Sequence, residues 1–230
     1  MENPSQQQKK HAAHHAATYI KSGMVVGLGT GATATLFVHR LAELLQRGEL
    51  ADIVGIPTSS TIEATARGLN VPLATLETHP VIDLTVDGAD EVDPQLNLIK
   101  GGGGALLREK IVAQASKREV IIVDEGKLSP VLGTAWHVPI EVVTFGWRTQ
   151  FEWLTQLGAT VTMRERQDGL PFLTDQGNYI LDANFGPINE PVALADKLNA
   201  RIGIVEHGLF VNIASEVIVG LNEGVRVLTR

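Results

Sequence analysis

Four carboxylates within seven residues, directly after a largely apolar segment, are the clearest sign of chemistry in this sequence. Residues 81–86 form the apolar segment, and Asp87-Gly-Ala-Asp-Glu-Val-Asp93 follows it. Lys100 comes ten residues after Asp90 and precedes four consecutive glycines at positions 101–104. Glycines allow a ligand to approach the backbone closely, and the N–H groups that open a following helix favour an anion. The pattern therefore indicates a site for an anionic ligand.

The four carboxylates do not all fit the same interpretation. Asp87 and Asp90 follow the third clear strand of the sequence, at the kind of strand end where an open parallel sheet binds its ligands. For Glu91 and Asp93 a solvated acidic loop is the better interpretation. Glu109 lies in the first turns of the helix after the glycines, where a carboxylate also improves the electrostatics of a helix end. The residues alone leave both interpretations of Glu109 open.

A glycine-rich turn, Gly27-Leu-Gly-Thr-Gly-Ala-Thr33, follows one expected strand and opens a helix. It fits the dinucleotide-binding fingerprint with alanine in the place of the third glycine. The acidic residue that would bind a ribose should end the second strand, but Asp52 begins the strand expected at residues 52–58. We therefore predict a turn that binds one terminal phosphate through backbone N–H groups and the hydroxyls of Thr30 and Thr33. A tight turn without a ligand is the alternative.

Two lysines near strand ends support an anionic substrate. Lys127 follows the strand expected at residues 119–123, and Lys100 directly precedes the glycines. One such cation is weak evidence. Two of them, together with a turn suited to phosphate, predict that the substrate is an anion.

Strands that alternate with helices must position these residues. In the first half we expect strands at residues 24–28, 52–58, 81–86 and 119–123, and helices at 9–22, from 33 to about 47, 60–67 and 105–116. This alternation predicts an α/β fold with a Rossmann-like, open, mostly parallel sheet that carries helices on both faces.

After about residue 132 the rhythm changes, and we expect a smaller α+β domain of the ferredoxin-like type. Its expected elements are strands at 138–143, 160–164 and 202–210, a hairpin of 172–174 and 178–181 around Asp175-Gln-Gly177, and helices at 147–157 and 190–199. Two short strands within residues 215–229 could return to the first sheet. The predicted domains are a Rossmann-like catalytic domain of residues 1–132 plus 211–230 and a smaller domain of residues 133–210.

The composition excludes several functional classes. The chain has 230 residues, a net charge of −7 and no basic run longer than Lys9-Lys10, so we expect neither nucleic acid nor a membrane as partner. It has no cysteine, which excludes disulfides and thiolate chemistry. No segment reaches the roughly 18 apolar residues of a membrane helix. Residues 1–10 lack the apolar core of a signal peptide, so we expect a cytoplasmic protein.

Three histidines raise the question of a metal. His11, His14 and His15 fall at positions i, i+3 and i+4 of one expected helix, a spacing that could hold an ion. Their alanine-rich surroundings favour an ordinary helix face, and no other cluster of ligand residues is evident. We therefore predict no metal site.

Taken together, these segments resemble the ribose-5-phosphate isomerase A family, the metal-independent isomerases of the pentose phosphate pathway. The resemblance covers nearly the whole length. Its most specific part is Asp-Gly-Ala-Asp together with Lys-Gly-Gly-Gly and the Arg-Glu-Lys that follows. The matching segments are residues 27–33, 58–60, 86–91, 99–110, 124–127 and 208–210.

The resemblance implies a two-domain enzyme that interconverts D-ribose 5-phosphate and D-ribulose 5-phosphate without a metal or an organic cofactor. It also implies an oligomer, which we expect to be a homodimer or a dimer of dimers. Glu109 matches the glutamate that transfers the proton, and Lys9 stands where some members contact phosphate. The implied substrate contacts are Thr30, Gly31, Ala32, Thr33, Asp87, Gly88, Ala89, Asp90, Lys100, Gly101, Gly102, Gly103 and Lys127.

The residue types suit these roles, and the predicted catalytic residues are Glu109, Asp87, Asp90 and Lys100. One carboxylate can remove the proton beside a carbonyl and return it to the neighbouring carbon, so Glu109 suffices as base and acid. Lys100 and the N–H groups of the glycine loop can stabilise the negative charge of the enediolate. Asp87, oriented by Asp90, is our hypothesis for the proton transfers that open the sugar ring.

Two departures and two other functional classes qualify the resemblance. Ala32 stands where relatives often carry serine, and Gly104 where alanine is common. A sugar-phosphate sensing domain shares this architecture, but only one helix precedes Met24, where a helix-turn-helix would be needed. A sugar-phosphate deaminase or a coenzyme A transferase on the same fold is the other class, although no glutamate nucleophile motif is evident.

Overall fold

The chain folds into two compact units in the computed structural model, which describes residues 4–230. Unit 1 consists of the described residues up to Ala89 together with Arg108–Lys127 and Ile213–Arg230. Unit 2 consists of Asp90–Leu107 and Leu128–Asn212. The chain therefore passes from one unit to the other four times.

These units differ from the predicted domains of residues 1–132 plus 211–230 and residues 133–210. The main difference is that Asp90–Leu107 belongs to unit 2, whereas the prediction placed it in the first domain. The predicted boundary thus separates the glycine loop from the residues that it packs against.

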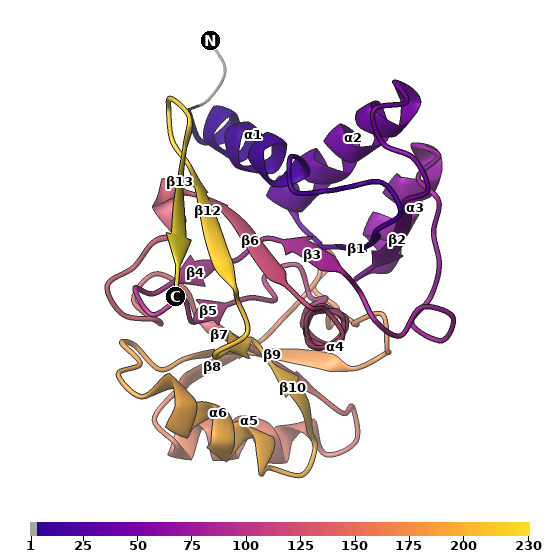
Figure 1. Cartoon of the computed structure of the whole chain (residues 1–230). Helices are drawn as coiled ribbons and strands as arrows, with labels where there is room; N and C mark the ends of the chain where they lie inside the picture. The colour runs from indigo at the N-terminus through magenta and orange to yellow at the C-terminus, as the bar shows by residue number, and fades with distance from the viewer. Residues whose placement is uncertain (1–3) are drawn as a thin grey trace. The chain divides into compact units, whose positions relative to one another are not determined.

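Unit 1 contains a six-stranded sheet in the order β13-β12-β6-β3-β1-β2 (Figure 1). All its pairs are parallel except β12 with β13. This confirms the Rossmann-like, mostly parallel sheet and the return of the C-terminal strands to it. The strands are β1 (Val25–Leu28), β2 (Val54–Pro57), β3 (Leu84–Asp87), β6 (Glu119–Asp124), β12 (Glu216–Gly220) and β13 (Val225–Thr229).

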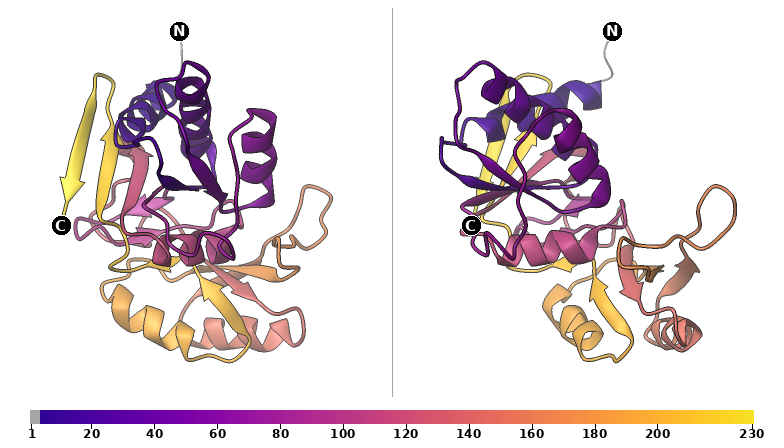
Figure 2. Two further views of the ribbon diagram at one scale, coloured as in Figure 1. Left: turned by 45° about the vertical axis from the view of Figure 1, so that its right-hand side comes forward. Right: turned by 90° about the vertical axis from the view of Figure 1, so that its right-hand side faces the viewer.

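Helices cover both faces of this sheet, as buried strands without polar alternation require. Residues of α1, α2 and α3 share one apolar core with one face, while Val112 and Ala115 cover Ile56 and Ile82 on the other. Figures 1 and 2 show α1 and α2 on one side of the sheet and α4 on the opposite side. The helices are α1 (Pro4–Ala17), α2 (Ala32–Gln46), α3 (Ser60–Gly68) and α4 (Leu106–Gln114), followed by the short 3₁₀ helix η1 (Glu125–Lys127).

Unit 2 contains a four-stranded antiparallel sheet in the order β10-β7-β9-β8. Its chain order, strand-helix-strand-strand-helix-strand, is the predicted ferredoxin-like arrangement. Both helices pack on one face of the sheet (Figure 1) and share its core. The elements are β7 (Val138–Val142), α5 (Trp147–Gln156), β8 (Thr160–Met163), β9 (Tyr179–Asn184), α6 (Pro191–Asn199) and β10 (Ile204–His207).

A small three-stranded sheet, β11-β5-β4, completes unit 2 and was not expected. It consists of β4 (Glu91–Val92), β5 (Leu98–Ile99) and β11 (Leu209–Phe210). The single strand predicted at residues 202–210 was wrong, because Gly208 divides it between two sheets. The predicted turn around Asp175-Gln-Gly177 forms, since Thr174 N–H donates to the carbonyl of Asn178, but no strand forms at residues 172–174 and β9 pairs with β8 and β7. Within residues 4–230, no helix combines the length and apolar character that a membrane crossing needs.

Candidate active site

The glycine-rich turn joins β1 to α2 and lies within unit 1. Gly31, directly before α2, has a φ of +114°, a conformation that favours glycine. Thr30 does not present its donors to a ligand: its N–H donates to Asp87 Oδ1 over 3.0 Å, and its hydroxyl donates to Ser59 Oγ over 2.8 Å. Since α2 begins at Ala32, its first N–H groups have no acceptor within the helix. The donors available for an anion are thus those that follow Thr30.

Asp87 ends β3, is fully buried and is held by the turn. Its Oδ1 accepts from the N–H groups of Thr30 and Gly88, at 3.0 and 2.7 Å. A Cβ at Gly29 would lie 2.2 Å from Asp87 Oδ1, so only glycine permits this approach. The structure therefore brings the predicted phosphate turn and the first predicted catalytic aspartate together. Gly88 and Ala89 follow, both half-buried.

Glu109 lies in the first turn of α4 and is 4% exposed. A carboxylate that only improves the electrostatics of a helix end can stay exposed to water, so the burial of Glu109 is not explained by that interpretation. A buried carboxylate on a helix that follows a glycine loop is suited to proton transfer, since carboxylates that act as general acids or bases in enzymes commonly lie in sites shielded from water.

Two lysines of unit 1 that the sequence singled out, Lys127 and Lys9, differ in their surroundings. Lys127 ends η1 and is half-buried. Lys9 Nζ lies 3.8 Å from Asp124 Oδ2, at the end of β6. The residue that some family members use for phosphate is thus paired with a carboxylate here.

The glycine loop lies within unit 2 and contacts the second predicted aspartate. Gly102 N–H donates to Asp90 Oδ2 over 2.7 Å, and Gly104 N–H donates to the carbonyl of Gly101 over 2.9 Å. These two loop N–H groups are therefore directed at the protein and not at a ligand. Gly103 N–H has no hydrogen-bond partner among residues 4–230.

Lys100 precedes this loop and is 2% exposed. Its N–H donates to the carbonyl of Gly208 over 2.9 Å, and its ammonium lies 5.3 Å from the centroid of the Phe210 ring. A Cβ at position 208 would come within 2.2 Å of the Lys100 carbonyl oxygen. Gly208 thus allows the chain to approach the backbone of Lys100 closely, next to the pairing of β11, which carries Phe210, with β5, which ends directly before Lys100.

The prediction that Glu91 and Asp93 lie in a solvated loop was wrong. Glu91 is fully buried, and its carboxylate accepts four backbone N–H groups from residues 133–136 at 2.9 to 3.2 Å. Asp93 is 6% exposed and accepts from the N–H groups of Gln95 and Asn97. Both carboxylates organise the loops of unit 2, because buried acceptors must find donors.

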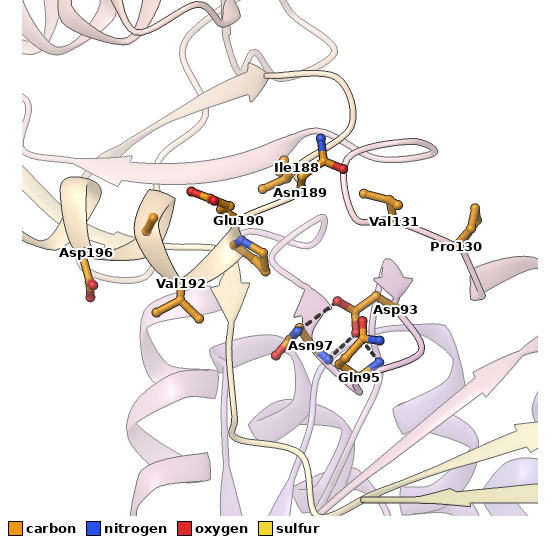
Figure 3. Close-up of a pocket in the computed structure, with 12 residues that line it drawn as sticks. Asp93, Gln95, Asn97, Pro130, Val131, Ile188, Asn189, Glu190, Val192 and Asp196 are labelled. Atoms are coloured by element: carbon orange, nitrogen blue, oxygen red, sulfur yellow. Dashed lines mark hydrogen bonds between the residues drawn. The ribbon is translucent and has the colours of Figure 1, made fainter.

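A separate hollow of about 580 Å³ in unit 2 lies beside Asp93 (Figure 3). Apolar residues such as Val131 and Ile188 line it together with the polar residues Asp93, Glu190 and Asp196. None of the predicted catalytic or substrate-binding residues lines this hollow.

Two of the three histidines of α1, His11 and His15, have protein partners. His11 Nδ1 lies 2.9 Å from the carbonyl oxygen of Leu221, and His15 Nε2 lies 3.3 Å from the hydroxyl of Tyr19. Over residues 4–230, no group of three or more potential ligand side chains has a geometry that could hold a metal ion.

Sequence reasoning gave no role to two sets of residues near the predicted site: Thr58 and Ser59, which were noted only as part of a matching segment, and Arg164. Thr58 and Ser59 bind the hydroxyl of Thr30, each with 2.8 Å between the oxygens. Arg164 binds the glycine loop, with its Nη1 2.8 Å from the carbonyl oxygen of Gly101. Their positions at strand ends were the available signal, since Thr58 follows β2 and Arg164 follows β8.

These features first define a class of protein: an α/β protein with a glycine-rich turn between a strand and a helix and with buried carboxylates at strand and helix ends. The sequence model of the family Ribose 5-phosphate isomerase A (phosphoriboisomerase A) matches residues 54–224. Ribose-5-phosphate isomerase A of Chloroflexus aurantiacus is 56% identical, over 96% of this chain and 92% of that protein. The protein of the same name from Desulfatibacillum aliphaticivorans is 56% identical over 95% of both chains.

Solved structures agree with the sequence relatives. A D-ribose-5-phosphate isomerase in complex with phospho-erythronic acid has a TM-score of 0.96 at 43% identity and covers 100% of both chains. Ribose 5-phosphate isomerase from Plasmodium falciparum has a TM-score of 0.94, also at 43% identity, over 98% of this chain and 99% of that one. The chain belongs to the ribose 5-phosphate isomerase A family, and it is an isomerase.

Proposed function

We propose that this chain interconverts D-ribose 5-phosphate and D-ribulose 5-phosphate, with Glu109 moving the proton between the two carbons. The observation that carries the proposal is the buried carboxyl group of Glu109, which lies in the first turn of α4, directly after the glycine loop. Membership of the isomerase family supports the choice of reaction.

Proton transfer requires a single carboxylate. Glu109 takes the proton from the carbon beside the carbonyl, which leaves an enediolate, and returns it to the neighbouring carbon. In the enediolate the hydroxyl proton also passes from the C2 oxygen to the C1 oxygen, so the ketose forms when Glu109 protonates C1, and no atom is gained or lost. A positioned carboxylate of this kind contributes a factor of about 10² to 10⁴ in rate.

The negative charge of the enediolate is stabilised best by hydrogen-bond donors that are in position before the reaction. We assign this role to the ammonium of Lys100 and the N–H of Gly103, because the N–H groups of Gly102 and Gly104 already donate within the protein. Preorganised donors of this kind lower the barrier without reorganisation during the reaction. Gly101 and Gly102 contribute the backbone of the loop.

The phosphate of the substrate is assigned to the N-terminus of α2, at Gly31, Ala32 and Thr33, with Lys127 as a further cation. Thr30 holds the turn in shape, since both of its donors have protein partners. Helix N-termini favour anions through their N–H groups and dipole. This binding energy holds the sugar for reaction at the other end.

Ring opening requires a proton to move between the C1 hydroxyl and the ring oxygen. We assign this transfer to Asp87, whose Oδ1 is fixed by the N–H groups of Thr30 and Gly88. Asp90 follows three residues later, so the chain itself keeps the two Cα atoms within about 11 Å. Because Asp90 binds Gly102 N–H, it orients the loop rather than the sugar.

The ligand of one solved relative is chemically consistent with this reaction. Phospho-erythronic acid, in that complex, is a phosphorylated four-carbon sugar acid. The two oxygens of its carboxylate share a negative charge in a plane, as the two oxygens of an enediolate do. An enzyme that stabilises an enediolate should bind such an acid more tightly than its substrate.

The test is formation of ribulose 5-phosphate from ribose 5-phosphate by the purified protein, with EDTA present and no cofactor added. Glu109→Gln should lower kcat by at least about 10² with little change in KM, because the amide cannot accept the proton. Glu152→Gln, an exposed position on α5, is the matched control and should keep full activity.

Other outcomes would redirect the proposal. Turnover that survives Glu109→Gln would keep the function and move the base, with Asp87 the next residue to test. Saturable binding of ribose 5-phosphate without turnover would favour the sensing domain instead.

The assembly and location are part of the same proposal. We propose a homodimer or a dimer of dimers, which light scattering of the purified protein would measure. The exposed side chains of Phe145 and Ile202, at 91% and 94%, support a surface that a second copy covers. We also propose a cytoplasmic location, in keeping with the bacterial relatives, although one relative from Arabidopsis thaliana is named as chloroplastic.

A further inference from the structure

We propose that Arg164 is a positioning residue for catalysis, which fixes the peptide groups of the glycine loop so that Gly103 N–H faces the substrate. This inference rests on the proposed isomerase function. Arg164 follows β8 in unit 2, and its side chain is 13% exposed. Neither the sequence patterns nor the roles assigned above include it.

The guanidinium group of Arg164 contacts two successive carbonyls of the loop. Its Nη1 donates to the carbonyl oxygen of Gly101 over 2.8 Å and to that of Gly102 over 3.1 Å. Consecutive glycines restrict the backbone less than any other residues, so an unsupported loop of this kind would adopt many conformations. The two bonds remove much of that freedom.

The peptide group between Gly101 and Gly102 is held from both ends. Arg164 binds its carbonyl, while Asp90 Oδ2 accepts its N–H over 2.7 Å. Because a peptide group is planar, two such bonds on opposite edges fix its orientation. Asp90 and Arg164 therefore act on the same peptide group, although they come from different parts of unit 2.

The next peptide group, between Gly102 and Gly103, contains the N–H that we propose faces the substrate. Arg164 binds its carbonyl, and in a trans peptide the N–H points to the opposite side. Gly103 N–H is thus turned away from Arg164, and it has no hydrogen-bond partner among the described residues. This N–H is the donor assigned above to the enediolate.

A carboxylate on the neighbouring strand fixes the guanidinium group itself. Arg164 Nε donates to Asp182 Oδ2 over 2.9 Å, and Nη2 donates to Oδ1 of the same group, which makes a bidentate pair. His137 Nε2 lies 3.1 Å from Asp182 Oδ1. Burial raises the pKa of Asp182, but the hydrogen bonds from His137 and Arg164 outweigh it, and the net pKa is lowered. The carboxylate therefore stays ionised and holds Arg164 in place at neutral pH.

Lysine cannot replace this arginine, because an ammonium group lacks the planar fork that spans two carbonyls and a carboxylate. Arg164→Lys retains the charge beside Asp182, so the protein should fold with a similar melting temperature. We expect kcat to fall by about tenfold, and by about 10² in Arg164→Gln, since small misplacement of catalytic groups has effects of this size. KM should stay within about threefold, because the phosphate is bound elsewhere.

The matched control is Arg166, two residues further along the chain. Its side chain is 52% exposed and pairs with the exposed Asp168. Arg166→Lys and Arg166→Gln make the same chemical changes without contact to the loop, and should leave kcat unchanged. Isomerase activity of the parent protein is measured alongside, so that a failure of the proposed function is recognised by an inactive parent.

Combination with Asp90→Asn separates positioning from a merely structural role. If both residues fix the same peptide group, the double variant Arg164→Lys/Asp90→Asn should lose less kcat than the product of the two single losses. The proposal is overturned if Arg164→Lys and Arg164→Gln keep kcat within threefold in an active protein. It is also overturned if the losses appear only in KM, or if the two single losses multiply in full.

Discussion

At the scale of single residues, Glu141 is a buried carboxyl group that the proposed reaction does not use. It lies on β7 and is fully buried, and its Oε1 accepts from Thr174 and Asn178 at 2.8 and 2.9 Å. Glu206 on β10 is its direct cross-strand neighbour. Burial raises the pKa of Glu141 most; the two hydrogen bonds lower it, and the charges of Glu206 and Asp175 raise it further.

This raised pKa predicts a pH dependence that Glu141→Gln should remove. Between the ordinary pKa of a glutamate and the raised value, the folded protein binds a proton that the unfolded chain has released. Stability should therefore fall as pH rises through this window. Glutamine does not titrate, so the free energy of unfolding of Glu141→Gln, relative to the parent, should increase with pH and then level off.

Urea unfolding between about pH 4.5 and pH 8 measures this difference. Glu223→Gln, at an exposed position, is the control and should give the same small difference at every pH. A difference between Glu141→Gln and the parent that does not change with pH would contradict the prediction.

The sequence allowed a prediction of which residues form the site, but it did not reveal which carboxylates are buried. Asp87 and Asp90 were identified by their place after a strand, and both are bound to the backbone of site loops. Glu91 and Asp93 look the same in the sequence, yet Glu91 lies on β4, both are buried, and both bind backbone N–H groups of segments without a predicted function. The N–H groups that bind Glu91 lie 42 to 45 residues further along the chain, and no local pattern reveals them.

At the scale of elements, the end of the glycine loop should not tolerate a side chain in this protein, although relatives often carry alanine there, because Phe172 lies against it. Gly104 has a φ of +82°, and a Cβ there would lie 2.5 Å from Cε1 of Phe172. Gly104→Ala should therefore combine backbone strain of about 1 to 3 kcal/mol with displacement of the aromatic ring. Gly169→Ala isolates the first effect, because Gly169 has a φ of +77° and nothing within 4 Å of its Cβ position.

Thermal and urea unfolding of the two variants measure the effects. We expect Gly104→Ala to lose more stability than Gly169→Ala, and its kcat to fall because the loop precedes α4 and Glu109. Equal losses of stability in both variants would contradict the prediction. They would show that Phe172 moves aside freely, so that its packing against the loop does not contribute to stability.

Long periodic elements were predictable, whereas short ones were not. The helices that became α2, α3, α5 and α6 agree with the predicted ranges to within a residue or two, because their apolar spacing extends over several turns. β4 and β5 contain two residues each, too few for an alternating pattern. The break at Gly208 depends on the nearby carbonyl of Lys100, which is distant in sequence.

At the scale of the whole molecule, the order of the elements was predictable but the division of the chain was not. Composition does not change at Ala89 or at Leu107, so no linker marks the places where the chain passes between units. Asp90–Leu107 joins unit 2 through long-range contacts alone: Ile99 lies in its core, and β5 pairs with β11.

This division predicts which piece of the chain can fold by itself. A fragment of residues 133–210 lacks Glu91 and β5, so the N–H groups of residues 133–136 lose their acceptor and β11 loses its partner strand. Buried donors without acceptors cost about 1 to 3 kcal/mol each, which a small unit cannot absorb. We expect this fragment to show no cooperative unfolding by circular dichroism.

A chain of residues 90–212 should behave differently if residues 108–127 are replaced by a flexible linker. About 15 glycine and serine residues reach roughly 20 Å on average, and they leave every contact within unit 2 in place. This chain should unfold cooperatively, and Glu91→Ala should destabilise it strongly, whereas the exposed Glu152→Ala should not. Cooperative unfolding of residues 133–210 alone would contradict the prediction, because it would mean that residues 90–107 bind to a unit that is already stable.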